Sequence, residues 1–199
     1  MLYNSSHETE TNKIGLFGGT FDPPHMGHLE VAKCVLRSKQ IDAVWLLPCW
    51  KHAFGKDPTS FYHRASMCYL LIRNEPNIYV CTDEAKIQST YSIDILKIIQ
   101  DTNPNKSFRL ILGIDNYCRM NEWKLKDKIL ELAPPIWVER PGIKNIPEST
   151  IKCFSNTSST EIKQKIELEG HLCNIPLSIE VKKYIAKNSL YKVISTKII

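Results

Sequence analysis

Short apolar runs alternate along this chain with segments whose apolar residues recur at helical spacing. The runs that we predict to be strands are Lys13 to Phe17, Ala43 to Leu47, Ile78 to Cys81, Phe108 to Leu112 and Ile136 to Val138. The segments with helical spacing among them are His25 to Arg37, His63 to Arg73 and Ser92 to Gln100. Strands separated by helices imply crossover connections. We therefore expect an α/β fold of Rossmann-like, doubly wound type, with a mainly parallel sheet and helices on both faces.

The length of the chain suits one domain of this kind. Its 199 residues, of which 43% are hydrophobic, can bury one substantial core. The first residues, MLYNSSHETETN, are polar and acidic, and they lack the basic and apolar regions of a secretory signal. We expect a disordered tail over residues 1–12 and a single domain over residues 13–199.

The net charge, the cysteines and the apolar runs indicate which partners and which cellular compartment to expect. The formal net charge of +5 is spread along the chain without a basic block, so a small polyanion explains it as well as a nucleic acid does, and we expect no nucleic-acid partner. Seven cysteines without a C-x-x-C pair argue against a disulfide framework and a zinc site. The longest near-apolar run, Ala43 to Trp50, is too short for a membrane span. We expect a cytoplasmic protein without a membrane partner, and its oligomeric state stays open.

The segment GLFGGTFDPPHMGH, residues 15–28, combines features that suit an anion. Gly18 and Gly19 end the first predicted strand, where missing side chains let backbone N–H groups approach a phosphate. His25 lies at the start of the next predicted helix, whose free N–H groups attract anions. His25 and His28, spaced i and i+3, face the same way and can both donate to phosphate oxygens. A plain turn with surface histidines is the alternative, but the combined pattern favours a phosphate site.

A second candidate anion site is TSSTEIK, residues 157–163. Ser158 and Glu161 have the spacing of a capping box at the start of a helix, and Gly170 is a suitable end for that helix. Capping alone does not explain three consecutive hydroxyls followed by Lys163, which a bound triphosphate would also favour. Both interpretations stay open at this point.

These segments carry a specific resemblance. GGTFDPPHMGH resembles the G-x-F-D-P-x-H-x-G-H signature of the nucleotidylyltransferase superfamily, and TSSTEIK resembles its late S-S-T-x-I-R motif. More narrowly, the chain is similar to the nicotinate/nicotinamide mononucleotide adenylyltransferases of bacterial type. The supporting segments are LLPCWKHAFGK, YHRASM, TYSIDIL, LILGIDNYCRMNEW, VERPG and IPLSIEVKKYIAKNSLY.

The resemblance implies transfer of AMP from ATP to nicotinate mononucleotide, with nicotinamide mononucleotide as a second acceptor. The products are deamido-NAD, or NAD, and pyrophosphate. The acceptor phosphate is already ionised and attacks the α-phosphate in line, so catalysis consists of positioning and charge neutralisation. Mg²⁺ is implied as a cofactor held by phosphate oxygens and water, without a protein metal site.

The resemblance also assigns residues to roles. The implied catalytic residues are His25, His28 and Lys163. The implied ATP-binding residues are Gly18, Gly19, Thr20, Phe21, Gly113, Asp115, Ser158, Ser159 and Thr160. The implied mononucleotide-binding residues are Lys51, His52, Lys56, Ser92, Trp123 and Arg140.

Several of these assignments have plainer alternatives. Trp123 could be a core residue, Ser92 a helix N-cap, and Gly113 with Asp115 a simple turn. Lys163 departs from the family's arginine and lacks its bidentate fork. Arg64, in the family's R-x-x-M pattern, is interpreted as structural.

Two other functional classes also remain. Another adenylyl- or cytidylyltransferase would keep both motifs without stacking a pyridine on Trp123. A nucleotide-sensing module would bind ATP without turnover, but such a module has no need of the His25 and His28 pair.

Overall fold

A single parallel sheet organises the chain. The computed structural model describes residues 12–50, 58–89, 91–139, 147, 150–153 and 157–193. Within these residues five strands pair in the order β3-β2-β1-β4-β5, and all pairs are parallel. The strands are β1 (Lys13–Gly19), β2 (Ala43–Pro48), β3 (Ile78–Val80), β4 (Ser107–Gly113) and β5 (Pro135–Val138). Strands β2 and β3 lie on one side of β1, and β4 and β5 lie on its other side. The strand order therefore reverses between β1 and β4, which is the switch point of the sheet.

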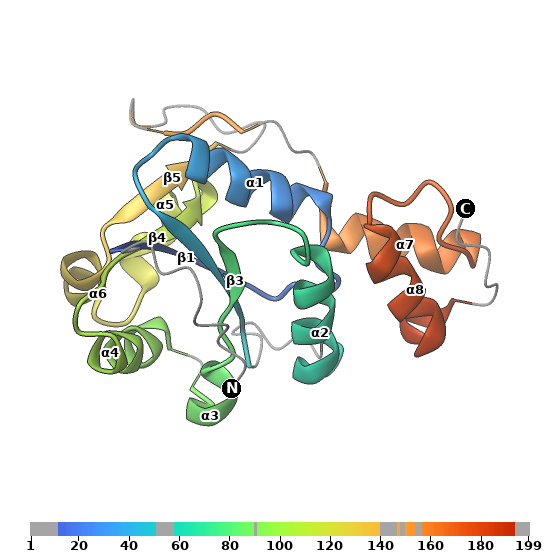
Figure 1. The fold of residues 1–199 in the computed structure, drawn as a ribbon, viewed down its shortest axis with the longest axis horizontal. Coiled ribbons are helices and arrows are strands. Elements are labelled where there is room, and N and C mark those ends of the chain that lie inside the picture. Colours follow the sequence, from blue (N-terminus) through green and yellow to red (C-terminus); the bar gives the residue numbers. More distant parts are fainter. Residues whose placement is uncertain are drawn as a thin grey trace.

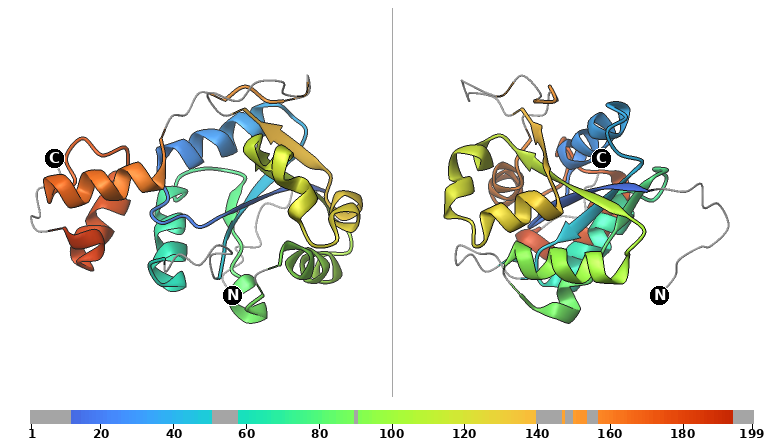
Figure 2. Two further views of the ribbon diagram at one scale, coloured as in Figure 1. Left: turned by 180° about the vertical axis from the view of Figure 1, so that it is seen from behind. Right: turned by 90° about the vertical axis from the view of Figure 1, so that its left-hand side faces the viewer.

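Helices cover both faces of this sheet (Figure 1). One core cluster joins the sheet to α1 (Met26–Arg37), α2 (Phe61–Leu71), α7 (Ser159–Glu169) and α8 (Ile179–Lys187). The other core cluster joins it to α4 (Ser92–Thr102) and α6 (Lys126–Leu132). Helices α7 and α8 lie beyond α1 and α2, at the opposite end of the molecule from α4 and α6 (Figures 1 and 2). The expected doubly wound fold is confirmed.

Shorter helices follow the carboxyl ends of two strands. They are α3 (Glu84–Ile87) after β3, and α5 (Asp115–Arg119) with the 3-10 turn η1 (Met120–Glu122) after β4; a second 3-10 turn, η2 (Leu190–Lys192), follows α8. In an open α/β sheet, ligands bind at this carboxyl edge. The short helices therefore lie where a site is expected.

The sequence patterns explain the two core clusters. All six residues of β2 are buried, with Val44 and Leu46 in one cluster and Trp45 and Leu47 in the other. A central strand that is covered on both faces requires such a continuous apolar run rather than an alternating one. The strand carries no side chain suited to chemistry, so functional groups must come from its ends.

The predicted elements are present with small shifts in their bounds. Helix α2 begins at Phe61 because Ser60 caps it, accepting a hydrogen bond from the N–H of His63 at 3.5 Å. Helix α7 ends at Gly170, whose φ of 66° lies in the left-handed region that favours glycine. All seven cysteines are free thiols. Among the helices of the described segments, none has the length and apolar character needed to cross a bilayer.

Candidate functional site

The turn between β1 and α1 is shaped by Phe21. Its backbone is left-handed, with a φ of 51°, and its buried ring lies against Phe17 and His28, with ring centroids 5.7 and 4.8 Å away. A Cβ at Gly19 would lie 3.2 Å from this ring, a tight contact that a side chain there could relieve only if the ring shifted. A Cβ at Gly18 would meet nothing within 4 Å. The protein itself does not demand a glycine at position 18, and the backbone there is open to a ligand.

The two histidines lie together as predicted. Their rings stack with centroids 3.7 Å apart and planes inclined by 29°. His25 is the N-cap of α1, and its N–H donates to His28 Nδ1 at 3.2 Å. Because Nδ1 accepts this bond, the proton of a neutral His28 ring lies on Nε2. The pair is thus fixed at the helix N-terminus with His28 Nε2 as a donor.

The start of α7 docks on the turn that precedes α1. Ser158 is the N-cap of α7 and accepts from the N–H of Glu161 at 3.1 Å, as its spacing predicted. Ser159 Oγ donates to the carbonyl of Pro23, 136 positions away in the chain, at 2.9 Å. Thr160, on the same turn, is exposed. Two helix N-termini that are remote in sequence are therefore brought to one place, and each is an anion-attracting end.

A buried carboxylate completes this contact. Asp22 is 4% exposed and accepts from Lys163 Nζ at 2.8 Å and from the Tyr191 hydroxyl at 2.7 Å. Burial works against ionisation, but hydrogen bonds from Lys163, Tyr191 and Thr59 prevail, and they hold the pKa of Asp22 below its ordinary value. The Lys163 side chain is 39% exposed, so its ammonium is oriented by Asp22 while still facing solvent.

Arg64 ties three loops together beneath this site. Its side chain is fully buried, and it donates to the carbonyls of Thr59 at 2.7 Å, Thr20 at 2.6 Å and Cys49 at 2.7 Å. Several charge-assisted bonds to backbone carbonyls are needed to make a buried cation tolerable. The structural role predicted for Arg64 is confirmed, and it fixes the position of Thr20.

Gly113 and Asp115 lie across the switch point from the glycines of β1. Leu16 of β1 pairs with Leu110 of β4. Gly19 and Gly113 each lie three residues beyond this pair, on the two neighbouring strands. Asp115 then begins α5. Both residues thus lie at the carboxyl edge of the sheet, as predicted.

Ser92 and Trp123 belong to segments that touch. Tyr91 is the N-cap of α4, so Ser92 is the first helical residue, and the alternative of a Ser92 cap is wrong. Lys124 Nζ lies 4.1 Å from the centroid of the Tyr91 ring, a cation–π contact that joins the residues next to Ser92 and Trp123. Trp123 is only partly buried, packing against the core cluster of α4 and α6. Four further predicted residues, Lys51, His52, Lys56 and Arg140, lie outside the described residues.

Comparison with known proteins agrees with this geometry. The cytidylyltransferase-like family model matches residues 16–165. The nicotinate-nucleotide adenylyltransferase of Bacillus subtilis is 31% identical over 187 residues, spanning 90% of this chain and 98% of the relative. A probable nicotinate-nucleotide adenylyltransferase of Anaeromyxobacter dehalogenans is 32% identical over 184 residues, spanning 90% and 97%. The chain belongs to the cytidylyltransferase-like family.

Solved structures show which members of this family the chain resembles in its fold. The nicotinic acid mononucleotide adenylyltransferase of Plasmodium falciparum, complexed with NaAD, superposes with a TM-score of 0.78 at 26% identity, covering 92% of this chain and 98% of that one. Its complex with APC gives a TM-score of 0.75 with the same identity and coverage. The resemblance to nicotinate mononucleotide adenylyltransferases is confirmed.

Sequence reasoning missed three polar groups in or beside the candidate site. Asp22 and Tyr191 form the network around Lys163, and Glu84 Oε2 accepts from the N–H of Trp50 at 2.7 Å. Asp22 stands inside the quoted F-D-P-P turn, so a signal for it was present. The partners of Tyr191 and Glu84 lie far away in the sequence, and no local pattern indicates them.

Proposed function

We propose that the chain transfers AMP from ATP to nicotinate mononucleotide, forming deamido-NAD and pyrophosphate. The observation that carries the proposal is the docking of α7 on the turn before α1, through Ser159 with Pro23 and Lys163 with Asp22. This contact gathers two helix N-termini, a histidine pair and an ammonium group at the carboxyl edge of the sheet. Such a cluster suits a polyphosphate and the charge that develops on it.

In this reaction the protein does not need to form a covalent bond with either substrate. The mononucleotide phosphate is an ionised nucleophile, so no general base is required, and catalysis comes from alignment and charge stabilisation. In this proposal His25 and His28 hold oxygens of the α-phosphate, with His28 Nε2–H as a donor. The N-terminus of α7, with Ser158 to Thr160, and Lys163 hold the β- and γ-phosphates that leave as pyrophosphate.

The remaining residues divide between the two substrates. Gly18, Gly19, Thr20 and Phe21 shape the turn on which the triphosphate rests. Gly113 and Asp115 meet the nucleoside of ATP. Ser92 and Trp123 take the pyridine ring, with Lys51, His52, Lys56 and Arg140 proposed for the mononucleotide from the resemblance.

The donors at this site also bear on Mg²⁺. The ring N–H groups and the ammonium are donors that attract anions, whereas the Ser and Thr hydroxyls can donate to an anion or offer a lone pair to a cation. The carboxylate among them, Asp22, is engaged by Lys163 and Tyr191. Within the described segments, no group of three His, Cys, Asp or Glu side chains could hold a metal ion. This donor set suits Mg²⁺ that is bound by phosphate oxygens and water as part of the ATP complex, where it neutralises phosphate charge.

Pyrophosphate release tests the proposal. The chain is incubated with ATP and Mg²⁺ and, in separate reactions, nicotinate mononucleotide, nicotinamide mononucleotide or phosphopantetheine; a parallel set contains CTP. We expect release with ATP and a pyridine mononucleotide. Release with phosphopantetheine alone, or with CTP alone, would identify another transferase. ATP binding without any turnover would identify a nucleotide-sensing module.

A further inference from the structure

The backbone that leaves β2 is held by charged groups on two sides. The N–H of Trp50 donates to Glu84 Oε2 at 2.7 Å. Arg64 Nη2 donates to the carbonyl of Cys49 at 2.7 Å and to that of Trp50 at 3.4 Å. Glu84 and Arg64 thus bind the same short stretch of main chain: Glu84 accepts from an N–H, and Arg64 donates to carbonyl oxygens.

This stretch is bonded directly to the proposed phosphate site. The N–H of Cys49 donates to the carbonyl of Gly19 at 2.9 Å, and Pro48 pairs with Gly19 across the sheet. Arg64 also donates to the carbonyl of Thr20. A displacement at Trp50 would therefore be transmitted to the Gly19–Thr20 backbone by hydrogen bonds.

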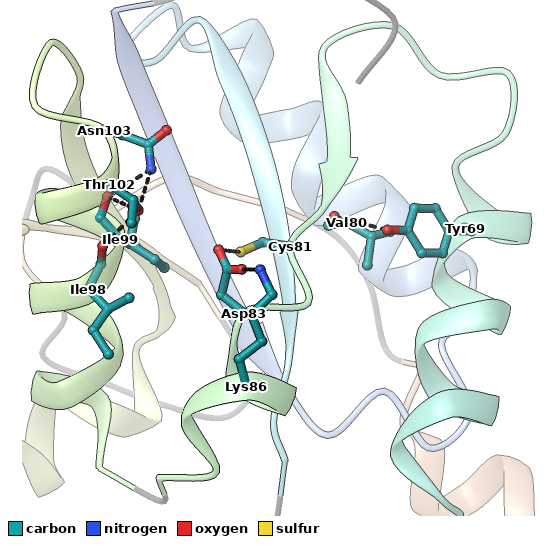
Figure 3. Close-up of polar contacts among 9 residues, drawn as sticks. All are labelled: Tyr69, Val80, Cys81, Asp83, Lys86, Ile98, Ile99, Thr102 and Asn103. Atoms are coloured by element: carbon teal, nitrogen blue, oxygen red, sulfur yellow. Dashed lines mark hydrogen bonds and ion pairs between the residues drawn. The ribbon is translucent and has the colours of Figure 1, made fainter. Parts of the chain in front are cut away.

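Glu84 is itself held in a fixed place. The preceding residue, Asp83, accepts from Lys86 Nζ at 2.7 Å and from Cys81 Sγ at 3.5 Å, which anchors α3 to the end of β3 (Figure 3). Glu84 is thus held at the start of a short helix that is tied to the end of β3.

The N–H of Trp50 could be satisfied by a neutral acceptor, so a buried carboxylate is unusual in this position. Burial raises the pKa of Glu84 to about 7, although the hydrogen bond from Trp50 and the charge of Arg64 act to lower it. Among the described residues, the other titratable groups near it are Asp83, which is paired with Lys86, and the thiols of Cys49 and Cys81, whose own pKa values are raised by burial. Glu84 therefore gains its charge close to neutral pH, and within the described segments the guanidinium of Arg64 is the cation that favours this charge.

We propose that Glu84 is a positioning residue that sets the affinity for ATP, by fixing the Cys49–Trp50 backbone against the Gly19–Thr20 turn. The inference rests on the proposed function. It follows that ionisation of Glu84 strengthens the bond to Trp50, since a charge-assisted hydrogen bond is stronger than a neutral one. The ATP side should respond more than the acceptor side, because the hydrogen bonds described above lead from Trp50 to the Gly19–Thr20 turn, on which the triphosphate is proposed to rest.

Kinetics of three variants test the role. Glu84→Ala should raise KM for ATP about ten-fold or more, the effect of losing a hydrogen bond to a charged group, while KM for the mononucleotide changes less than about two-fold. Glu84→Gln keeps an acceptor for Trp50 and should recover most of this loss. The wild type should gain affinity as pH rises through 7 and Glu84→Gln should not, so the difference between them cancels titration of the substrate phosphate. The matched control is Glu131→Gln, a 67% exposed side chain on α6.

A measurement without substrate tests the bond itself. Labelling with ¹⁵N-tryptophan gives backbone amide signals from four residues, and Trp50→Phe assigns the relevant one. The Trp50 amide should titrate near pH 7 in the wild type and stay constant in Glu84→Gln. A Trp50 signal that does not titrate, or equal effects of Glu84→Ala on both KM values, would overturn the inference. A wild type that is inactive with both pyridine mononucleotides would instead overturn the proposed function, and the NMR titration would still decide whether Glu84 controls Trp50.

Discussion

Lys163 Nζ lies 2.8 Å from Asp22 Oδ2, so the first turns of α7 are paired by charge with the turn that opens α1. The family's usual arginine would present a planar fork, whereas lysine presents a compact charge on a flexible stem. Asp22 restricts that flexibility, because its carboxylate is buried and also fixed by Tyr191. An ammonium group has three donors, so the bond to Asp22 is compatible with phosphate binding.

If Lys163 grips the triphosphate, Lys163→Ala should raise KM for ATP by about ten-fold or more and KM for the mononucleotide far less. The variant also leaves Asp22 with fewer donors, at a cost of about 1–3 kcal/mol in unfolding free energy. Steady-state kinetics with each substrate varied, together with urea unfolding, separate the two effects. Lys163→Arg is the control that keeps the charge. Equal increases in both KM values would indicate general destabilisation.

The histidine pair allows a sharper separation of packing from catalysis. His28→Asn places an amide oxygen where Nδ1 accepts the N–H of His25, but it cannot reach the position of Nε2. Both His28→Asn and His28→Ala should lower kcat by about 10²-fold or more, the usual cost of removing one preorganised donor to a developing anion. Single-turnover rates and thermal unfolding are the measurements. Normal turnover in folded His28→Asn would exclude the role.

Much of the fold could be predicted because its signals are local. Buried strands such as β2 are continuous apolar runs, and Ser158 with Gly170 marks the ends of α7 by capping chemistry alone. The stacked histidines follow from their i, i+3 spacing on one helix turn.

The remaining features depend on contacts that form only in the assembled fold. Asp22 and Lys163 are 141 positions apart, and Trp50 and Glu84 are 34 apart. Neither pair has a spacing rule that a single sequence can reveal. Arg64 could be assigned a structural role from its motif, but the carbonyls that it binds, those of Thr59, Thr20, Cys49 and Trp50, come from three separate loops.

Arg64→Met should lower the unfolding free energy by about 3 kcal/mol or more, because methionine fills similar volume but leaves buried carbonyl oxygens without a donor. Equilibrium unfolding in urea at pH 7 measures the loss. Arg73→Met, an exposed arginine just after the same helix, is the matched control and should change stability by less than about 0.5 kcal/mol. Similar values for the two variants would contradict the structural assignment.

The raised pKa of Glu84, about 7 against an ordinary 4.5, also predicts a pH dependence of stability. Between these values the folded state holds a proton that the unfolded state has released, so this group makes unfolding easier as pH rises from about 4.5 to 7. Its share is on the order of 1–3 kcal/mol. Urea unfolding from pH 4 to 8 should show a flatter profile for Glu84→Gln than for the wild type. Parallel profiles would place the pKa of Glu84 near its ordinary value.

The last prediction concerns the choice of mononucleotide. Lys124, held over the Tyr91 ring, places a positive charge beside the segments that carry Ser92 and Trp123. That charge, and the net positive chain, favour a nicotinate carboxylate over a neutral amide. Backbone N–H donors near Trp123 and Ser92 would satisfy a carboxylate, whereas the NH₂ of nicotinamide would face another donor, a mismatch of about 1–3 kcal/mol. We expect kcat/KM for nicotinate mononucleotide to exceed that for nicotinamide mononucleotide by roughly ten- to a hundred-fold. Parallel measurement of the two kcat/KM values decides the matter, and a preference for the amide would show that this pocket presents an acceptor, not donors, to the pyridine substituent.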